Sequence, residues 1–223
     1  MILFLDLETT GLESSDKIVS IALLGEDLEV YELVNNGKKI PPLASSINHI
    51  TNEMLKNKPK LEESKAYKLL EQHNCESTTL VGHNIKFDLQ KLNEYGFFFK
   101  GNVIDTLRVT KHLIPECEMF SLQFLRYELK LYRLEEKTLM AHNALDDTKL
   151  IKFLYEYLQD IESSNKMIEL SEKNVLMQKL NFGKHNSKYI EDIVISDRSY
   201  LEWLLTNVQD LDEDLKYSIN YYL

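Results

Sequence analysis

The chain has 223 residues, 43% of them hydrophobic and 28% charged, which is enough for one globular domain with a small addition. Its formal net charge of −10 argues against tight, non-specific binding to duplex nucleic acid, because such binding depends on many Lys and Arg contacts with phosphates. The two cysteines match no metal-ligand spacing, and the apolar start MILFL is too short for a signal-peptide core or a membrane span, so we expect a cytoplasmic protein with reduced thiols.

Three strands are predicted at the beginning of the chain. Odd and even residues of the segment 1–7 form two largely apolar faces, a pattern typical of a central strand covered on both sides. Residues 17–24 and 28–34 predict two further strands joined by a short turn at 25–27. We therefore expect an antiparallel hairpin that extends the sheet from the first strand.

Helices and strands alternate in the segment that follows. The predicted elements are a helix over 61–73, a strand over 79–81, a helix over 85–95, a strand over 102–105, a helix over 121–129 and a long helix from 144 to about 161. We expect Asn84 and Ser121 to cap the helices that they precede, and Gly96 to end the helix that Asn84 begins. Three strands followed by this alternation predict an α/β fold with a mixed sheet flanked by helices.

A change of composition near residues 162–166 predicts a domain boundary. We predict a first domain over residues 1–162, a polar and partly helical connector over 163–179, and a small domain over 180–223. The small domain is expected to be either α/β or helical.

The small domain contains signals for two helices. Ser196 and Asp197 are predicted to start one helix, and the last segment places Leu215, Ile219 and Tyr222 on one stripe of another. Trp203, the one tryptophan of the chain, is expected in the core of this domain. The alternative is a platform on which nucleic-acid bases stack.

Asp6 and Glu8 lie two residues apart on the first predicted strand, so their side chains point to the same side. Two buried carboxylates repel each other and lose hydration unless a positive charge compensates them. No Lys or Arg is adjacent, and a hard divalent cation would satisfy both groups. The alternative is that Glu8 lies at the strand end in solvent.

Asp147 and Asp88 are predicted to point from helices toward the sheet. Asp147 shares one helical stripe with the apolar residues at positions 151, 154 and 158, and Asp88 shares one with those at 85, 92 and 95. The neighbouring Asp146 has a structural explanation, because with Asn143 as N-cap it occupies the third helical position, where a carboxylate favours the helix dipole. We therefore predict Asp147 as the ligand and Asp146 as structural.

His142 is the candidate general base. It lies five residues before Asp147, on the approach to a helix, and the ordinary pKa of histidine suits proton transfer near neutral pH. The competing residue is His83, which we interpret as structural, in the loop before the helix that contains Asp88.

Three segments resemble the motifs of a known family. FLDLETTGL, GHNIKFD and HNALDD resemble, in order, the three exonuclease motifs of the DEDDh 3′–5′ exonucleases, a DnaQ-like group of the ribonuclease H-like superfamily. The segment INHITNEML is also similar to one that usually contains HGIT, although Asn48 and His49 depart from it. The resemblance covers about residues 1–161 and implies a ribonuclease H-like fold. The tail from Phe182 to Leu204, with its FGK turn and its DRSYLEWL run, resembles the C-terminal domain of exodeoxyribonuclease X-like proteins.

This resemblance implies a two-metal-ion hydrolase that uses Mg²⁺ or Mn²⁺. Asp6 would bridge both ions, and Glu8 and Asp147 would complete the site that activates water. Asp88 would act at the second ion, partly through water. Two ions about 4 Å apart would hold the attacking and leaving oxygens, and His142 would take the proton from the water.

The same resemblance implies a substrate and partners. Thr9, Thr10 and Leu12 follow the first strand and are predicted to contact the terminal nucleotide. The expected substrate is a single strand or a 3′ end, with DNA favoured over RNA, and the expected product is a 5′-mononucleotide. The enzyme would serve in proofreading, with a DNA polymerase or another replication partner, as the polymerase III epsilon subunit does, or in DNA repair. An RNA 3′–5′ exonuclease and a catalytically silent module that binds a replication partner are the alternatives, and no membrane association is expected.

Overall fold

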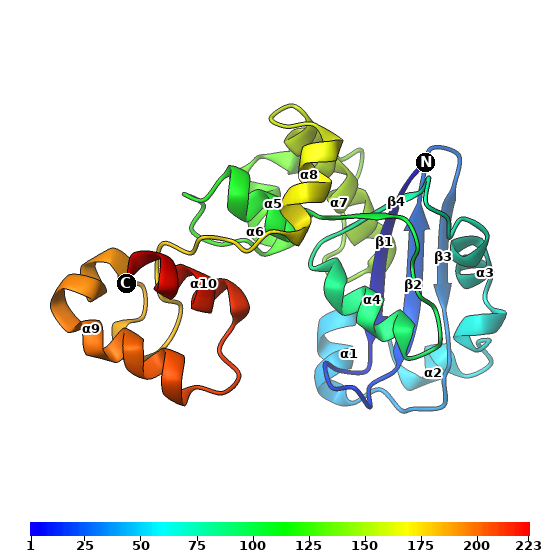
Figure 1. The fold of residues 1–223 in the computed structure, drawn as a ribbon. Coiled ribbons are helices and arrows are strands. Elements are labelled where there is room, and N and C mark those ends of the chain that lie inside the picture. The colour runs from blue at the N-terminus through cyan, green and yellow to red at the C-terminus, as the bar shows by residue number, and fades with distance from the viewer. The chain divides into compact units, whose positions relative to one another are not determined.

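The computed structural model describes all 223 residues, which divide into two compact units (Figure 1). The first unit contains residues 1–109 and 119–171, and the second contains residues 110–118 and 172–223. None of the helices combines the length and the apolar character needed to cross a membrane. The boundaries predicted at residues 162 and 179 stay predictions.

A five-stranded mixed sheet forms the centre of the first unit, in the order β3-β2-β1-β4-β5. The strands are β1 (Ile2–Thr9), β2 (Ile18–Leu24), β3 (Glu29–Leu33), β4 (Thr79–Gly82) and β5 (Asn102–Asp105). The pairs β1–β2 and β2–β3 are antiparallel, whereas β4 runs parallel to both β1 and β5. The predicted mixed sheet, its antiparallel hairpin and its central first strand are confirmed.

Helices cover the sheet and connect its strands. They are α1 (Pro42–Asn48), α2 (Asn52–Leu55), α3 (Lys65–Gln72), α4 (Ile85–Asn93), α5 (Thr106–Leu113), α6 (Leu122–Glu128), α7 (Ala144–Gln159) and α8 (Ser164–Glu172), with the 3₁₀ turns η1 (Leu61–Glu63) and η2 (Leu131–Leu134). The sequence analysis did not predict α1, α2 and α5. All three are short, with at most eight residues, and such helices depend on tertiary contacts.

The two faces of β1 pack against different helices. Leu3, Leu5 and Leu7 are buried in a cluster that also contains residues of α3 and α4. On the opposite face the ring of Phe4 meets that of Tyr155 from α7 edge-on, with centroids 5.5 Å apart. Because side chains alternate along a strand, Asp6 and Glu8 share the face that α7 covers.

The helix predicted over 61–73 is divided in two. Ser64 has extended backbone angles (φ −67°, ψ 150°), so η1 ends before it and α3 begins after it. The Ser64 hydroxyl accepts a hydrogen bond from the N–H of Tyr67 at 3.2 Å. A serine that caps a helix competes with continuing the preceding turn, which explains the break.

Asn84 does not cap α4 with its side chain, contrary to the prediction. Its backbone is left-handed (φ 61°, ψ 39°), and its N–H donates to the carboxylate of Asp105 at 2.9 Å. An acceptor on the neighbouring strand β5 thus replaces the local cap. The helix ends at Asn93, earlier than predicted, and Gly96 follows in the left-handed region (φ +79°), where glycine is favoured. Ser121 does cap its helix, since its hydroxyl accepts from the N–H of Phe124.

The second unit is helical, which decides between the two predicted alternatives. It contains the turn η3 (Gly183–His185) and the helices α9 (Ile190–Asn207) and α10 (Glu213–Tyr222). The backbone leaves helical geometry at Asp197 within α9, so a helical segment begins again where the sequence predicts a helix start. The stripe predicted on α10 is present, with Leu215 and Ile219 buried.

The prediction that Trp203 lies in the core of the small domain is wrong. Its side chain is 52% exposed, and its ring stacks on that of Tyr200 with centroids 6.2 Å apart. The helical period turns Leu201 and Leu204 inward and leaves Trp203 on the outer side of α9. Aliphatic side chains therefore form this core without the tryptophan.

Candidate active site

Four carboxylates gather around the carboxyl end of β1. Asp6 and Glu8 come from β1 itself, Asp147 from the first turn of α7, and Asp88 from α4. They are close enough for Asp6 to experience the charges of the other three. Asp6 and Glu8 lie opposite Ala22 and Ser20 of β2, and these small side chains leave room above the carboxylates.

Asp88 is held by the backbone of β1. Its Oδ1 accepts a hydrogen bond from the N–H of Leu7 at 3.1 Å, and its side chain is buried. The pairing of β1 with β4 extends only to Phe4 and Val81, so β4 provides no partner for this N–H. The carboxylate of Asp88 satisfies the buried donor, and α4 is thereby tied to the central strand.

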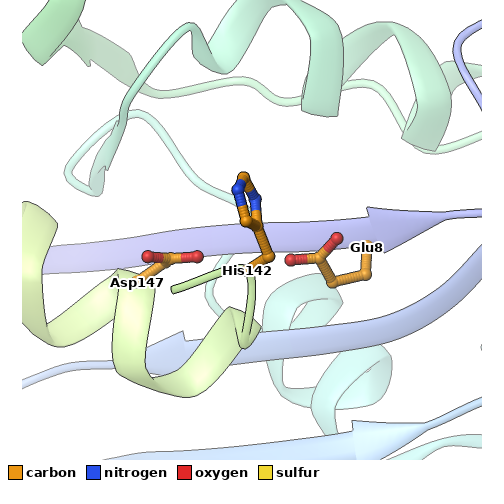
Figure 2. Close-up of side chains that lie close together, drawn as sticks. All are labelled: Glu8, His142 and Asp147. Carbon is orange, nitrogen blue, oxygen red and sulfur yellow. The ribbon is translucent and has the colours of Figure 1, made fainter. Parts of the chain in front are cut away.

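Glu8, His142 and Asp147 form the most compact group (Figure 2). Their ligand atoms all lie within 4.8 Å of one another. The carboxylates of Glu8 and Asp147 point toward each other, and the ring of His142 rises beside them (Figure 2). His142 is exposed and has a left-handed backbone (φ 58°) in the turn before α7.

Asp6, Glu8 and Asp147 resist ionisation in the metal-free protein. Burial, together with the charges of Asp88, Asp147 and Glu8, raises the pKa of Asp6 well above its usual range. Asp6 opens toward the cleft, yet protein atoms surround it on its other sides. Burial and the charges of Asp147 and Asp88 raise the pKa of Glu8 to about 8, and burial raises the pKa of Asp147 to about 7.

Asp88 belongs to the same electrostatic group. Burial raises its pKa to about 8, although hydrogen bonds from its own backbone and from that of Leu7 act in the opposite direction. No Lys or Arg forms an ion pair with any of the four carboxylates. Carboxyl groups that share a buried site without a counter-charge are unfavourable until a cation binds them.

The donor set fits divalent cations. Hard ions such as Mg²⁺ and Mn²⁺ prefer carboxylate oxygens, and a pair of them would supply the positive charge that this group lacks. Asp6, Glu8 and Asp147 surround the open side of the site, while Asp88 lies buried behind it and accepts a hydrogen bond from Leu7. The site can therefore hold cations beside an anionic substrate.

A cleft of about 350 Å³ opens over these groups. Its lining residues are Asp6, Leu7, Glu8, His83, Ser121, Leu122, Gln123, His142 and Asp147. Residues far apart in the sequence thus meet at one surface, and the space is sufficient for a nucleotide-sized ligand.

Asp146 and Asp147 occupy different environments, although they are adjacent. The side chain of Asn143 accepts from the N–H of Asp146 at 3.2 Å, which makes Asn143 the N-cap of α7. The carboxylate of Asp146 accepts from the N–H of Met140 at 2.8 Å. Asp146 therefore stabilises the turn that contains His142, whereas Asp147 faces the cleft.

His83 lines the cleft, but both of its ring nitrogens are engaged. Nδ1 lies 3.0 Å from the hydroxyl of Thr106, and Nε2 lies 2.8 Å from the carbonyl oxygen of Phe120. These contacts connect the loop before α4 to the segment before α6. This arrangement agrees with the interpretation of His83 as structural.

Gln123 is a cleft residue that the sequence analysis missed. Its Nε2 donates to Oδ1 of Asp147 at 3.1 Å, and its Oε1 accepts from Arg126 at 3.1 Å. Arg126 in turn forms a buried bidentate ion pair with Glu135, with both N–O distances 2.6 Å. The chain of contacts orients the Asp147 carboxylate. Sequence periodicity carries no signal for it, because Gln123 and Asp147 lie on different helices.

The loop after β1 is firmly held, and this affects the three predicted substrate contacts. The hydroxyl of Thr10 is buried and donates to Asp16 at 2.7 Å, and that of Thr9 donates to the carbonyl oxygen of Gly11 at 2.7 Å. Lys91, also missed from the sequence, donates from a buried position to the carbonyl oxygen of Glu13. Leu12 is 82% exposed and is the side chain that this loop presents.

Two family models match the chain. The RNase T exonuclease model matches residues 3–155, and the exodeoxyribonuclease X-like C-terminal model matches residues 180–209. Both agree with the resemblances drawn from the motifs.

Curated relatives and a solved structure extend this similarity. The chain is 27% identical to exodeoxyribonuclease 10 of Escherichia coli K12, an alignment that spans 100% of this chain and 99% of the relative. It is 31% identical to the DNA polymerase III subunit epsilon of Treponema pallidum over 67% of this chain and 72% of the relative. A structure of exonuclease X in complex with 5′ overhanging duplex DNA superposes with a TM-score of 0.63 and 26% identity, over 77% of this chain and 99% of that one.

Proposed function

This chain belongs to the RNase T exonuclease family, and from that premise we propose that it hydrolyses DNA from the 3′ end and releases 5′-mononucleotides. The observation that supports the proposal most directly is the cluster of Asp6, Glu8, His142 and Asp147 at the mouth of one cleft. Such a cluster combines sites for cations with a proton acceptor, the two requirements of phosphodiester hydrolysis by this type of enzyme.

We propose that Asp6, Glu8, Asp88 and Asp147 hold two Mg²⁺ or Mn²⁺ ions. When bound, the ions supply the charge that polarises the scissile phosphate and lowers the pKa of a water molecule. The carboxyl groups would lose their protons on binding the cations, and Gln123 holds the Asp147 carboxylate in place through its 3.1 Å hydrogen bond.

His142 is proposed as the general base. Its ring lies beside Glu8 and Asp147, where it can accept a proton from the attacking water (Figure 2). Because the side chain is exposed, the proton can then pass to solvent. The 5′-phosphate of the product would leave through the open side of the cleft.

Substrate contacts are assigned to the loop after β1. We propose that Leu12 packs against the terminal nucleotide, and that Thr9 and Thr10 hold the loop that presents it. Lys91 and Asp16 hold the same loop through hydrogen bonds with the backbone of Glu13.

The names of the relatives favour DNA as substrate. Exodeoxyribonuclease 10 aligns over almost its whole length, and the second family model matches the tail that such proteins share. A polymerase partner, as the name of the epsilon relative implies for that protein, would be detected by co-elution with a purified replicative polymerase.

Digestion of matched single-stranded DNA and RNA, each labelled at the 5′ or the 3′ end, tests the proposal. In Mg²⁺ or Mn²⁺ we expect 5′-labelled DNA to give a ladder that shortens from the 3′ end, and EDTA to abolish it. Faster loss of RNA would reject the DNA assignment. Absence of cleavage with either metal would reject the enzymatic function.

A further inference from the structure

A pair of exposed tyrosines lies beside the cleft, on the same structural segment that contains Gln123. Tyr127 at the end of α6 is 61% exposed, and Tyr132 in η2 is 40% exposed. Their ring centroids are 5.7 Å apart with an interplanar angle of 33°. Neither ring is buried, so packing in the core does not explain them.

The tyrosine pair follows the cleft residue Gln123 along α6. Gln123 lines the cleft, and Tyr127 follows it by four residues, so the two side chains share one helical face about 6 Å apart. The guanidinium of Arg126, which contacts Gln123, also lies 5.4 Å from the ring centre of Tyr127. A strand that leaves the cleft along this helix would therefore meet the two rings.

The segment around the pair carries a slight excess of positive charge. The segment 126–137 contains four cationic side chains and three carboxylates, in a chain whose net charge is −10. Arg126 and Glu135 neutralise each other beneath the surface, whereas Lys130 and Arg133 are exposed and form no ion pair. The Arg133 guanidinium lies 6.0 Å from the ring centre of Tyr132.

The contacts that hold α6 and η2 in place do not depend on the two tyrosine rings. Leu125 and Leu131 are buried on either side of the turn, and the bidentate pair of Arg126 with Glu135 joins α6 to the segment after η2. Replacing the tyrosines should therefore leave this part of the fold intact.

We propose that Tyr127, Tyr132, Lys130 and Arg133, named here the α6–η2 surface, bind the unpaired strand on the 5′ side of the nucleotide that is cleaved. Bases stack on the two rings, and the cations contact phosphates. Unpaired bases are required, because only they expose a face to an aromatic ring. The inference rests on the proposed function, since it assigns the path of the same substrate.

The test compares a long substrate with a minimal one. The variant Tyr127→Ala/Tyr132→Ala is assayed on a twelve-nucleotide oligothymidylate and on the p-nitrophenyl ester of thymidine 5′-monophosphate, which is too small to reach the surface. Stacking on aromatic rings is worth about 5- to 150-fold in affinity per base. We expect the ratio of kcat/KM for the oligonucleotide to that for the ester to fall at least fivefold, through KM.

Two controls accompany this measurement. Phe98→Ala removes an aromatic ring of similar exposure (64%) away from the surface and should leave the ratio unchanged. Tyr127→Phe/Tyr132→Phe keeps the rings and should restore the ratio, which would show that the rings and not their hydroxyl groups are required. An unchanged ratio in the alanine variant would overturn the proposal.

Fluorescence anisotropy separates this inference from the proposed function. A labelled oligothymidylate is titrated in EDTA, where no cleavage is expected, with the wild type and the alanine variant. Weaker binding by the variant supports the surface even if the protein cleaves nothing. Equal binding overturns it and would leave the exposed rings to a protein partner.

Discussion

At the scale of single residues, the neighbours Asp146 and Asp147 have different roles. Asp146 accepts a backbone hydrogen bond from Met140, and Asp147 faces the cleft with Gln123 as its donor. We expect Asp147→Ala to lower the rate of nucleotide release by several orders of magnitude and Asp146→Ala to lower it by less than about tenfold, measured in single-turnover assays. An active Asp147 variant beside an inactive Asp146 variant would contradict the assignment.

A variant of His142 can distinguish the role of proton transfer from that of cation binding. We expect His142→Ala to remain folded and to be stabilised by Mn²⁺ like the wild type, because the carboxylates are unchanged. Its kcat should fall about 10²- to 10⁴-fold, the usual contribution of a general base. Thermal melting with and without Mn²⁺, together with kcat, checks both parts. A variant that no longer responds to Mn²⁺ would show that the histidine is a ligand.

The raised carboxylate pKa values predict how stability changes with pH. In the metal-free protein the folded state favours the protonated form of these carboxyl groups. Their contribution to the free energy of unfolding is therefore complete below about pH 4, and it is lost as the pH rises through about 7 to about 8. Cations should therefore raise Tm more at pH 8.5 than at pH 6.

Asp6→Asn tests the same electrostatics. Because asparagine cannot ionise, the variant avoids placing a buried charge at position 6 beside the other three carboxyl groups, so in EDTA at pH 8 it should melt higher than the wild type. A gain of about 1 kcal/mol corresponds to about 2–4 °C in a domain of this size. Mn²⁺ should no longer raise Tm. If the variant melts lower than the wild type in EDTA at pH 8, the repulsion described here does not exist.

At the scale of elements, one ion pair joins α6 to the segment after η2. Arg126 and Glu135 are both only 5% exposed at the side chain. Arg126→Met would leave Glu135 buried without a partner, and we expect it to cost about 3–5 kcal/mol in urea unfolding. Lys152→Met, which breaks the exposed pair with Glu156, should cost less than about 1 kcal/mol. Equal costs would mean that the buried pair has no structural role.

Helix caps were predicted correctly at Ser121 and Asn143, whereas the side-chain cap at Asn84 and the uninterrupted helix across Ser64 were wrong. Ser121 and Asn143 accept hydrogen bonds from residues three positions on, an interaction that the sequence reveals directly. Asn84 fails because its N–H binds Asp105 on another strand, and Ser64 interrupts a helix that periodicity alone would continue.

At the scale of the whole molecule, the net charge of −10 limits how the substrate is held. Few phosphates can be neutralised, so we expect KM for single-stranded DNA to rise less than about tenfold between 50 and 200 mM salt. A protein with six to ten phosphate contacts would lose about 10³- to 10⁵-fold over this range. Steady-state kinetics at constant Mg²⁺ would decide, and a loss of that size would contradict the stacking mode.

The sequence by itself determined the fold class, the central strand and the candidate site residues, because alternation, helical stripes and short motifs are local patterns. Only the tertiary structure decided that Asp88 binds Leu7 across 81 positions, that Gln123 orients Asp147, and that Trp203 lies outside its core. The physical reason is that hydrogen bonds and raised pKa values depend on which groups meet in space and how far they are removed from water. The spacing of residues along the chain specifies neither the hydrogen bonds nor the pKa values.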